Sequence, residues 1–331
     1  MDDTQLFILS IGALGFGMYL LFKGGDWTID SAVYIARKFG ISPMVIGFTI
    51  VAFGTSFPEL LVSVNANLAG SPGIAIGNVI GSNIANILFV VGATAIVATM
   101  VAVRKELLRD VIVMMLATVF MMYFMTTGAI GSFAGGIMIV FLLSYIIYQY
   151  IMTSKGKIKP DEVEMPEFKN MGMACLFLLL GLGSIAFGAE FLVRGAKTAA
   201  TIIGVPEAVI GLSIIAIGTS LPELSTCIIA AMKKQTDIIL GNILGSNVFN
   251  ILMIMGVTSM VKPIEQSAIN PQVVSLDMWV MFGVSALFSL ILLAYGKINK
   301  PIGIVFLAGY IFYIGLIYAL YLQDDLNILS S

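Results

Sequence analysis

Histidine is absent from this 331-residue chain, and cysteine occurs only twice, at Cys175 and Cys227. Both cysteines fall inside apolar runs, so we expect two small buried residues rather than a disulfide. Charged residues make up only 11% of the chain, against roughly 25% in soluble domains. These shortages argue against a soluble protein and against a zinc or copper site, and no basic patch indicates nucleic-acid binding.

Long apolar runs are present instead: 59% of the residues are hydrophobic, and the mean hydropathy is +1.03. A helix of about 20 residues crosses a bilayer core, whereas barrel strands alternate over about 10 residues, and the runs show no such alternation. We therefore predict an all-α integral membrane protein with ten transmembrane helices in the cell membrane. The predicted spans are 5–22, 44–67, 73–100, 107–125, 128–152, 172–193, 207–231, 238–261, 275–295 and 301–321.

The distribution of lysine and arginine predicts the orientation of these helices. With the N-terminus outside, 14 of the 17 basic residues face the cytoplasm, as the positive-inside rule requires, and only Arg194, Lys197 and Lys262 lie outside. Both termini are then extracellular or periplasmic. The start of the chain, MDDTQLF, lacks the basic segment of a signal peptide, so we expect the first helix to be retained.

An internal repeat organises the chain into two halves, 1–153 and 173–331, joined by a hydrophilic cytoplasmic linker at 154–172. At an offset of 164 residues, GTSFPEL recurs as GTSLPEL, and GNVIGSNIANIL recurs as GNILGSNVFNIL with eight identities in twelve. Each half has five predicted spans, an odd number, so the second copy enters the membrane from the opposite side. Inverted repeats of this kind are typical of secondary transporters, whose binding sites lie near the midplane where the copies meet.

The first motif predicts a broken helix. Pro58 has no N–H to offer the carbonyl of Gly54, and Gly54 is itself a poor helix former. We expect the backbone to open here and to free carbonyl oxygens, including that of Ala52. Irregular backbone survives at membrane depth only where it is buried in protein or lines a wet cavity. The second copy has the equivalent residues Gly218, Pro222 and Ala216.

Two intramembrane carboxylates, Glu59 and Glu223, follow the predicted breaks. A charge at the bilayer centre costs about 2.5–3.5 kcal/mol, and the spans that carry these residues contain no lysine, arginine or histidine that could balance it. The counter-charge must therefore come from metal ions or protons. Thr55 lies four residues before Glu59 and shares a helical face with it.

Polar residues spaced by four form a stripe on the following helix of each half. Together with the glutamates they supply only hard oxygen ligands, which suit Ca²⁺ and Na⁺ better than zinc or copper. A proline kink, a GxxxG pair or a polar stripe would each have a structural explanation alone, but their joint duplication favours an ion site. The stripes are Asn78, Ser82 and Asn86, and Asn242, Ser246 and Asn250, flanked by the GxxxG pairs Gly77/Gly81 and Gly241/Gly245.

These paired segments resemble the two α-repeats of the sodium/calcium exchanger family, with repeat cores at 44–100 and 207–261. The resemblance covers almost the whole chain and implies four clustered cation sites reached by alternating access, with long, tilted helices 1 and 6 that slide across the core. It implies that Ca²⁺ is bound by Glu59, Glu223, Thr55 and Thr219. It implies sodium sites formed by Ala52, Ser56, Ser82 and Glu59, and by Ala216, Thr219, Ser220, Ser246 and Glu223, with Asn86 and Asn250 at the centre.

The hypothesis from the sequence is a secondary antiporter that exchanges Na⁺ for Ca²⁺ electrogenically, without a cofactor and as a monomer. Relatives that also carry K⁺ typically have Asp where this chain has Asn250, which argues against K⁺ transport. A proton/Ca²⁺ exchanger remains an alternative. A cation channel is disfavoured because two inverted copies form no ring around a pore, and an enzyme is disfavoured because nucleophile and zinc ligands are missing.

Overall fold

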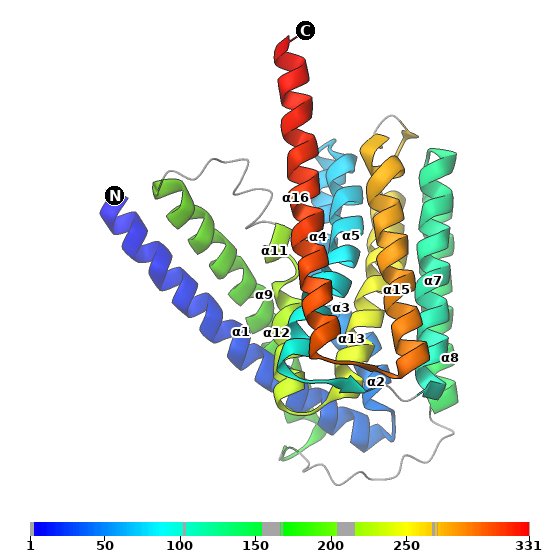
Figure 1. Ribbon diagram of the computed structural model, residues 1–331. Helices are drawn as coiled ribbons and strands as arrows, with labels where there is room; N and C mark the ends of the chain where they lie inside the picture. Colours follow the sequence, from blue (N-terminus) through cyan, green and yellow to red (C-terminus); the bar gives the residue numbers. More distant parts are fainter. Residues whose placement is uncertain are drawn as a thin grey trace.

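The computed structural model describes residues 3–101, 104–153, 166, 168–203, 216–266, 269 and 271–330, and these are almost entirely helical. Figure 1 shows an upright bundle with two long helices, α1 and α9, leaning away from it on one side. In this view α16 ends above the bundle, and α1 begins at the upper left, at its end away from the bundle. The chain is thus an all-α integral membrane protein, as the sequence predicts.

In the first half, α1 (Asp3–Phe39) is followed by a broken span and by a third, continuous span. The elements after α1 are α2 (Pro43–Ile46), the π-helical turn η1 (Gly47–Val51), α3 (Ala52–Thr55), α4 (Phe57–Leu68), α5 (Pro72–Ala85), the π-helical turn η2 (Asn86–Val91), α6 (Gly92–Val97), the short strand β1 (Met100–Val101), α7 (Arg104–Thr127) and α8 (Ser132–Thr153).

The second half repeats this order, and several elements repeat their bounds 164 residues later: α4 as α12, α5 as α13, η2 as η4 and α6 as α14. The elements are α9 (Met171–Ile202), α11 (Ala216–Gly218), α12 (Leu221–Met232), α13 (Thr236–Phe249), η4 (Asn250–Met255), α14 (Gly256–Val261), η6 (Val273–Asp277), α15 (Met278–Tyr295), β2 (Lys297–Ile298) and α16 (Lys300–Ser330).

Short backbone pairings join the halves at both ends of the bundle. At the lower end in Figure 1, β1 pairs antiparallel with β2, which connects α15 to α16. At the other end of α7, Ile130 pairs with Ile264, which follows α14. In each case the segment after the third span of one half pairs with the connection between the last two spans of the other half. The pairings therefore follow the two-fold relation of the repeats.

Eight described helices are long and apolar enough to cross a membrane, and the bent pair Pro43–Thr55 and Phe57–Leu68 makes a ninth span. The predicted span 207–231 begins outside the described residues, and its described part contains the apolar helix α12. A span apolar enough to cross a membrane need not face lipid: the most apolar 18 consecutive residues of Thr236–Val261 are all buried within the described structure. The span formed by α13, η4 and α14 is thus the centre of the bundle.

The helices α1 and α9 pack together through glycines. A Cβ atom at Gly24 would lie 2.7 Å from the carbonyl oxygen of Gly181, and one at Gly17 would lie 2.7 Å from that of Gly188. Small residues of this kind let two membrane helices approach along their backbones. Both helices extend beyond their predicted spans, since the expected end of the first was residue 22 and the helix continues to Phe39.

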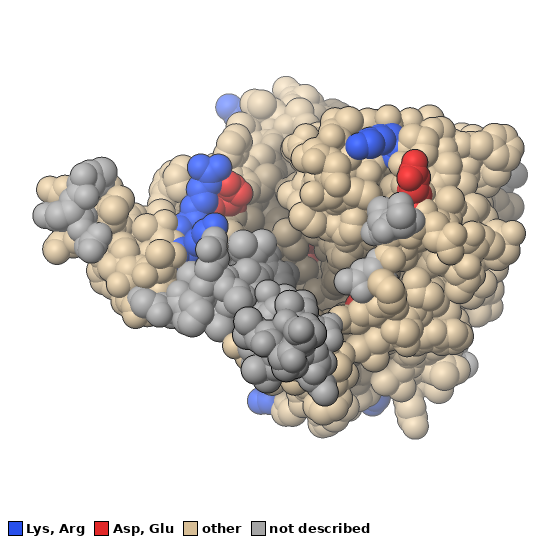
Figure 2. Space-filling model, turned by 90° about the horizontal axis from the view of Figure 1, so that it is seen from above, with Lys and Arg blue, Asp and Glu red and all other residues tan. Residues whose placement is uncertain are grey.

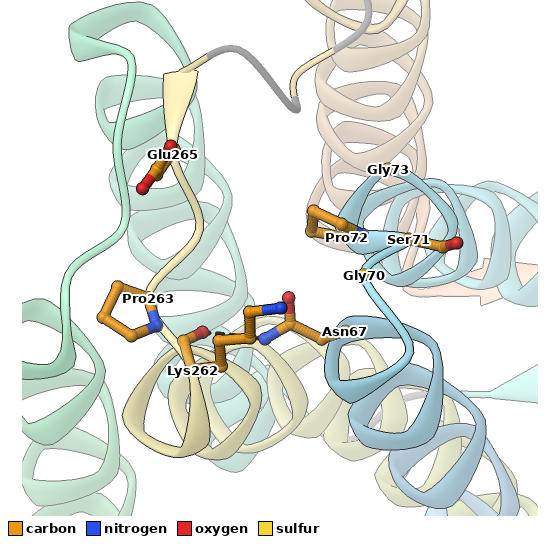
Figure 3. Close-up of a pocket in the computed structure, with 8 residues that line it drawn as sticks. All are labelled: Asn67, Gly70, Ser71, Pro72, Gly73, Lys262, Pro263 and Glu265. Atoms are coloured by element: carbon orange, nitrogen blue, oxygen red, sulfur yellow. Dashed lines mark hydrogen bonds between the residues drawn. The ribbon is translucent and has the colours of Figure 1, made fainter.

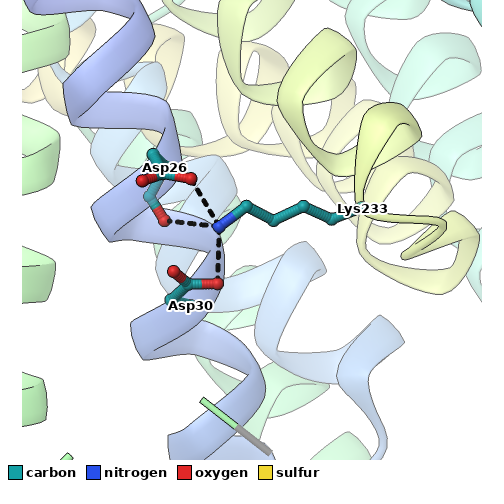
Figure 4. A network of polar contacts seen from close by, with 3 residues as sticks. All are labelled: Asp26, Asp30 and Lys233. Carbon is teal, nitrogen blue, oxygen red and sulfur yellow. Dashed lines mark hydrogen bonds and ion pairs between the residues drawn. The ribbon is translucent and has the colours of Figure 1, made fainter. Parts of the chain in front are cut away.

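Lys233, which follows α12, reaches across to α1 and binds two aspartates, Asp26 and Asp30 (Figure 4). The ammonium lies 2.6 Å from a carboxylate oxygen of each. The extension of α1 beyond its apolar segment therefore carries a specific contact with the core. The prediction of two buried cysteines is correct for Cys227 and wrong for Cys175, which is exposed because it lies on an outward face of α9.

Candidate functional site

Both predicted breaks are visible in the backbone. The first span bends by 43° between Thr55 and Phe57, and the second is interrupted between Gly218 and Leu221. The intervening serines have nearly the same conformation, with φ −84° and ψ 1° at Ser56 and φ −90° and ψ 3° at Ser220. In each copy the proline is the second residue of the new helix, where its missing N–H has no helical partner to lose.

The break places each glutamate in the first turn of a new helix, Glu59 in α4 and Glu223 in α12. Unpaired N–H groups and the helix dipole favour a negative charge there. Both side chains are only 1% exposed, and Glu223 accepts a hydrogen bond from Ser56, which lies three residues before Glu59. Neither has an ion pair with a described lysine or arginine. Two buried charges of one sign, contributed by opposite repeats, thus share one region.

Hydroxyl groups of the first break contact the second repeat. Ser56 Oγ donates to Glu223 Oε1 at 3.4 Å. Thr55 Oγ1 donates to Asn242 Oδ1 at 3.3 Å and lies 3.5 Å from Ser246 Oγ. The residues that the sequence assigns to separate halves therefore converge on a single polar centre inside the apolar bundle.

Several buried polar atoms at this centre have no hydrogen-bond partner among the described residues. They are Oε2 of Glu59, Oε2 of Glu223, Oγ of Ser220, and the amide oxygen and nitrogen of Asn86 and Asn250. A buried polar group without a partner costs about 1–3 kcal/mol, and a charged group costs more. Five of these atoms are oxygens, and carboxylate, amide and hydroxyl oxygens are the ligand types that bind Ca²⁺ and Na⁺.

The two asparagines occupy equivalent positions at the start of the π-helical turns η2 and η4. Turns of this type are frequent at functional sites because the extra residue changes which side chains face inward. The sequence repeat predicts that Asn86 and Asn250 occupy equivalent positions. It does not predict that the helix widens into a π-helical turn at each of them.

A second pair of asparagines fixes each glutamate-bearing helix to the span that follows it. Asn78 donates to Ser63 Oγ at 2.9 Å and to the backbone oxygen of Glu59 at 3.2 Å. In the second half, Asn242 donates to the thiol of Cys227 at 3.5 Å. Cys227 is the counterpart of Ser63 at the repeat offset. The sequence analysis treated Cys227 only as a small buried residue and did not predict that it accepts this hydrogen bond.

The carbonyl of Ala52 differs from the prediction. It is not freed by the break, because it accepts the backbone N–H of Ser56 at 3.0 Å and the hydroxyl of Thr55 at 3.3 Å. In the second copy the N–H of Ser220 bonds instead to Ile217, so the carbonyl of Ala216 does not receive the equivalent bond. The two breaks share a shape but not a hydrogen-bond pattern.

The surroundings of the GxxxG pairs differ more strongly. A Cβ atom at Gly241 would lie 2.2 Å from the backbone oxygen of Met44, and one at Gly245 would lie 2.3 Å from that of Phe48. At Gly77 and Gly81 no described atom lies within 4 Å of such a Cβ.

A pocket of about 420 Å³ opens where the first-half GxxxG pair is uncovered. Ser82 and Thr219, both predicted ion ligands, line it together with residues of α4, η6 and α16. Neither takes part in a described side-chain hydrogen bond, unlike their counterparts Ser246 and Thr55. The binding region is thus sealed on the α13 side and open on the α5 side.

A larger cavity of about 560 Å³ lies at one end of the bundle (Figure 3). Its lining includes neither Glu59 nor Glu223. Asn67 forms part of its wall and donates to the backbone oxygens of Thr258 and Lys262, which holds α4 against α14. Seen from above, the molecule is hollowed near its centre, and few lysine or arginine side chains lie on this face (Figure 2).

An inverted pair of broken helices around shared buried carboxylates defines a secondary transporter of cations. The family model described as sodium/calcium exchanger protein matches residues 9–153 and 173–319. The chain belongs to this family.

Relatives and solved structures agree with this assignment over nearly the full length of the chain. The sodium/calcium exchanger MaX1 of Methanosarcina acetivorans is 30% identical over 333 residues, covering 89% of this chain and 94% of that protein. The inner membrane protein YrbG of Escherichia coli is 32% identical, covering 94% and 97%. The sodium-calcium exchanger NCX_Mj, in crystals soaked with 10 mM Na⁺ and no Ca²⁺, aligns with a TM-score of 0.81 at 32% identity, covering 93% of this chain and 99% of that one. These matches support Ca²⁺ antiport.

Proposed function

We propose that the protein exchanges Na⁺ for Ca²⁺ across the cell membrane by alternating access, at the polar centre around Glu59 and Glu223. The observation that carries the proposal is the pair of buried carboxylates, one from each repeat, that have unpartnered oxygens and no positive partner among the described residues. One Ca²⁺ balances both charges, and Na⁺ ions can replace it. Competition for the same two side chains is what couples the two fluxes.

The ligand assignment follows the repeat. We propose that Ca²⁺ binds Glu59, Glu223, Thr55 and Thr219. We propose one sodium site at Ser56, Ser82, Glu59 and Ala52, whose carbonyl would give up its hydrogen bonds to Ser56 and Thr55 when it binds the ion. We propose a second at Ala216, Thr219, Ser220, Ser246 and Glu223. Asn86 and Asn250 lie at the centre and offer amide oxygens that no described group uses.

Alternating access requires that the site open to one side at a time. In the structure the glycines of the first-half GxxxG pair are uncovered and those of the second-half pair are packed against backbone. In the opposite-facing state the first-half pair would be packed and the second-half pair uncovered. An empty site resists the change of face because two bare carboxylates would then be enclosed without a counter-charge. The paired helices α1 and α9 lean away from the rest of the bundle (Figure 1) and are the elements that we propose to move.

Orientation completes the proposal. The lower end of the bundle in Figure 1 carries the β1–β2 pair, which includes Lys297, whereas few basic side chains lie on the face in Figure 2. By the positive-inside rule we place the lower end in the cytoplasm and both termini outside. The proposed working unit is the monomer, since each chain supplies both glutamates.

Radiolabelled Ca²⁺ uptake into proteoliposomes loaded with Na⁺ tests the proposal. Uptake should require the outward Na⁺ gradient and should be abolished by Glu59→Gln or Glu223→Gln. Glu190→Gln is the matched control, because this exposed glutamate pairs within α9 with Arg194. If more than two Na⁺ are exchanged for each Ca²⁺, a valinomycin-imposed membrane potential should change the rate. Uptake that follows a pH gradient instead of the Na⁺ gradient would identify a proton-coupled exchanger and refute Na⁺ coupling.

A further inference from the structure

A second buried carboxylate motif is duplicated in the fold, outside the segments that carry the glutamates. In the first half, Tyr145 of α8 donates to Asp110 of α7. In the second half, Tyr313 of α16 donates to Asp277 of η6, at 3.0 Å. Each pair joins the last two spans of its repeat, and each aspartate is at most 8% exposed. The two pairs are thus equivalent in position, but their surroundings differ.

The pair in the first half is closed. Asp110 Oδ1 also accepts the amide of Gln149 at 2.6 Å, and the ring of Tyr145 packs edge-on against Phe48. Phe48 in turn lies against Gly245 of the sealed second-half helix. Asp110 lines neither the 420 Å³ pocket nor the 560 Å³ cavity. The pair holds α7 to α8 beneath the covered side of the binding region.

The pair in the second half opens onto the 420 Å³ pocket. Asp277 and Tyr313 line this pocket with Ser82 and Thr219, and Tyr313 is the one partner described for the carboxylate. No described lysine or arginine pairs with Asp277. The hydroxyl of Ser82 belongs to a side chain only 5% exposed and takes part in no described hydrogen bond. A buried negative charge, two free hydroxyls and space for water therefore surround one cavity.

We propose that Asp277, with Ser82 and Thr219, binds a cation in this pocket, as a waiting site on the open route to the exchange site. All three donors are hard oxygens, which bind Ca²⁺ and Na⁺, and a single carboxylate in a wet pocket holds a partly hydrated ion weakly enough to release it. Ser82 and Thr219 are shared with the exchange site, so an ion at Asp277 is adjacent to its next ligands. The waiting site rests on the proposed function only for its role in transport.

Binding is tested without transport in a protein whose exchange site is disabled by Glu59→Gln and Glu223→Gln. Isothermal titration with Ca²⁺, and terbium luminescence sensitised by the tyrosines of the pocket, should show one weak residual site. Asp277→Asn should abolish it, and Asp110→Asn should not. Asp277→Asn is a conservative change, because the amide oxygen can still accept the phenol proton of Tyr313 and preserve the helix contact. Absence of residual binding, or binding unaffected by Asp277→Asn, overturns the waiting site whether or not the parent protein exchanges ions.

Transport tests the role of the site. In the otherwise unmodified protein, Asp277→Asn should raise the Ca²⁺ concentration for half-maximal uptake about three- to tenfold from the side on which the pocket opens, with the maximal rate retained. Tyr313→Phe, which keeps the charge but removes the hydrogen bond, should not raise it. An equal rise with Tyr313→Phe would show that the pair acts only as a link between η6 and α16, and would overturn the proposal.

Discussion

The most demanding consequence of the structure is that one substitution, made at equivalent glycines of the two repeats, should have opposite effects on stability. Gly245 packs against the broken span of the first half. An added methyl group would lie 2.3 Å from the backbone oxygen of Phe48 and 2.7 Å from the Cβ atom of Ala52. At Gly81, the counterpart, the same methyl group meets no described atom within 4 Å.

The magnitudes follow from two competing terms. Replacing glycine by alanine inside a helix contributes about 1 kcal/mol through helix propensity. Overpacking costs about 1–3 kcal/mol, and the upper part of this range applies where the obstacle is backbone, as it is at Phe48. For a chain of this size about 1 kcal/mol corresponds to a shift of roughly 2 °C in melting temperature. Gly245→Ala should therefore melt about 2–4 °C lower, whereas Gly81→Ala should melt unchanged or about 2 °C higher.

The assay is thermal unfolding of the purified variants in detergent at fixed Na⁺ and Ca²⁺, followed by size-exclusion chromatography of the heated samples. The rate of ion exchange is a second measurement that distinguishes the variants. Gly81→Ala should slow exchange despite its stability, because the opposite-facing state would bring the first-half glycine into the close contact now made by the second. Equal melting shifts for the two variants, or a stabilised Gly245→Ala, would contradict the assigned packing difference between the halves.

Three further outcomes are expected. Lys233→Met removes both contacts to Asp26 and Asp30 of α1, each worth about 0.2–1 kcal/mol, so hydrogen exchange around these residues should quicken about two- to thirtyfold. The difference should shrink in 1 M salt. Asn250→Asp adds a third carboxylate to the polar centre and should lower the Ca²⁺ concentration for half-maximal uptake; an unchanged value would place this side chain outside the site. Thr55→Ala loses hydrogen bonds to α13, worth about 0.5–1.5 kcal/mol each, and should melt at least 1 °C lower. Thr219→Ala loses no described hydrogen bond, so it should alter Ca²⁺ uptake without altering the melting temperature.

The sequence alone predicted the two helix breaks and a glutamate after each of them because local chemistry encodes both. A proline four residues after a glycine interrupts a helix wherever it lies, and an intramembrane glutamate without a basic neighbour must find a cation. The offset of 164 residues then placed both copies in one arrangement. The positions of Thr55, Ser56 and Glu223 next to one another follow from these facts and from the inverted topology.

The differences between the halves could not be predicted in this way. A repeated sequence describes both halves alike, whereas the packed molecule covers Gly245 and leaves Gly81 open. The bond between the carbonyl of Ala52 and Ser56 also depends on how far the break unwinds, which neighbouring spans decide. The extent of α1 was underestimated because Asp26 and Asp30 interrupt its apolar run. Both pair with Lys233, and the turns beyond them bury Val33 and Ile35 in the core.

The backbone pairings between β1 and β2 and between Ile130 and Ile264 carry a consequence for the origin of the molecule. Each links one half to the other, so a single half leaves these edges, and its glutamate, without their counterparts. A half-length ancestor could have built this centre only by associating with an upside-down twin. Such a gene product would have had to insert in both directions in the same membrane, and fusion of two copies would later have fixed one of each.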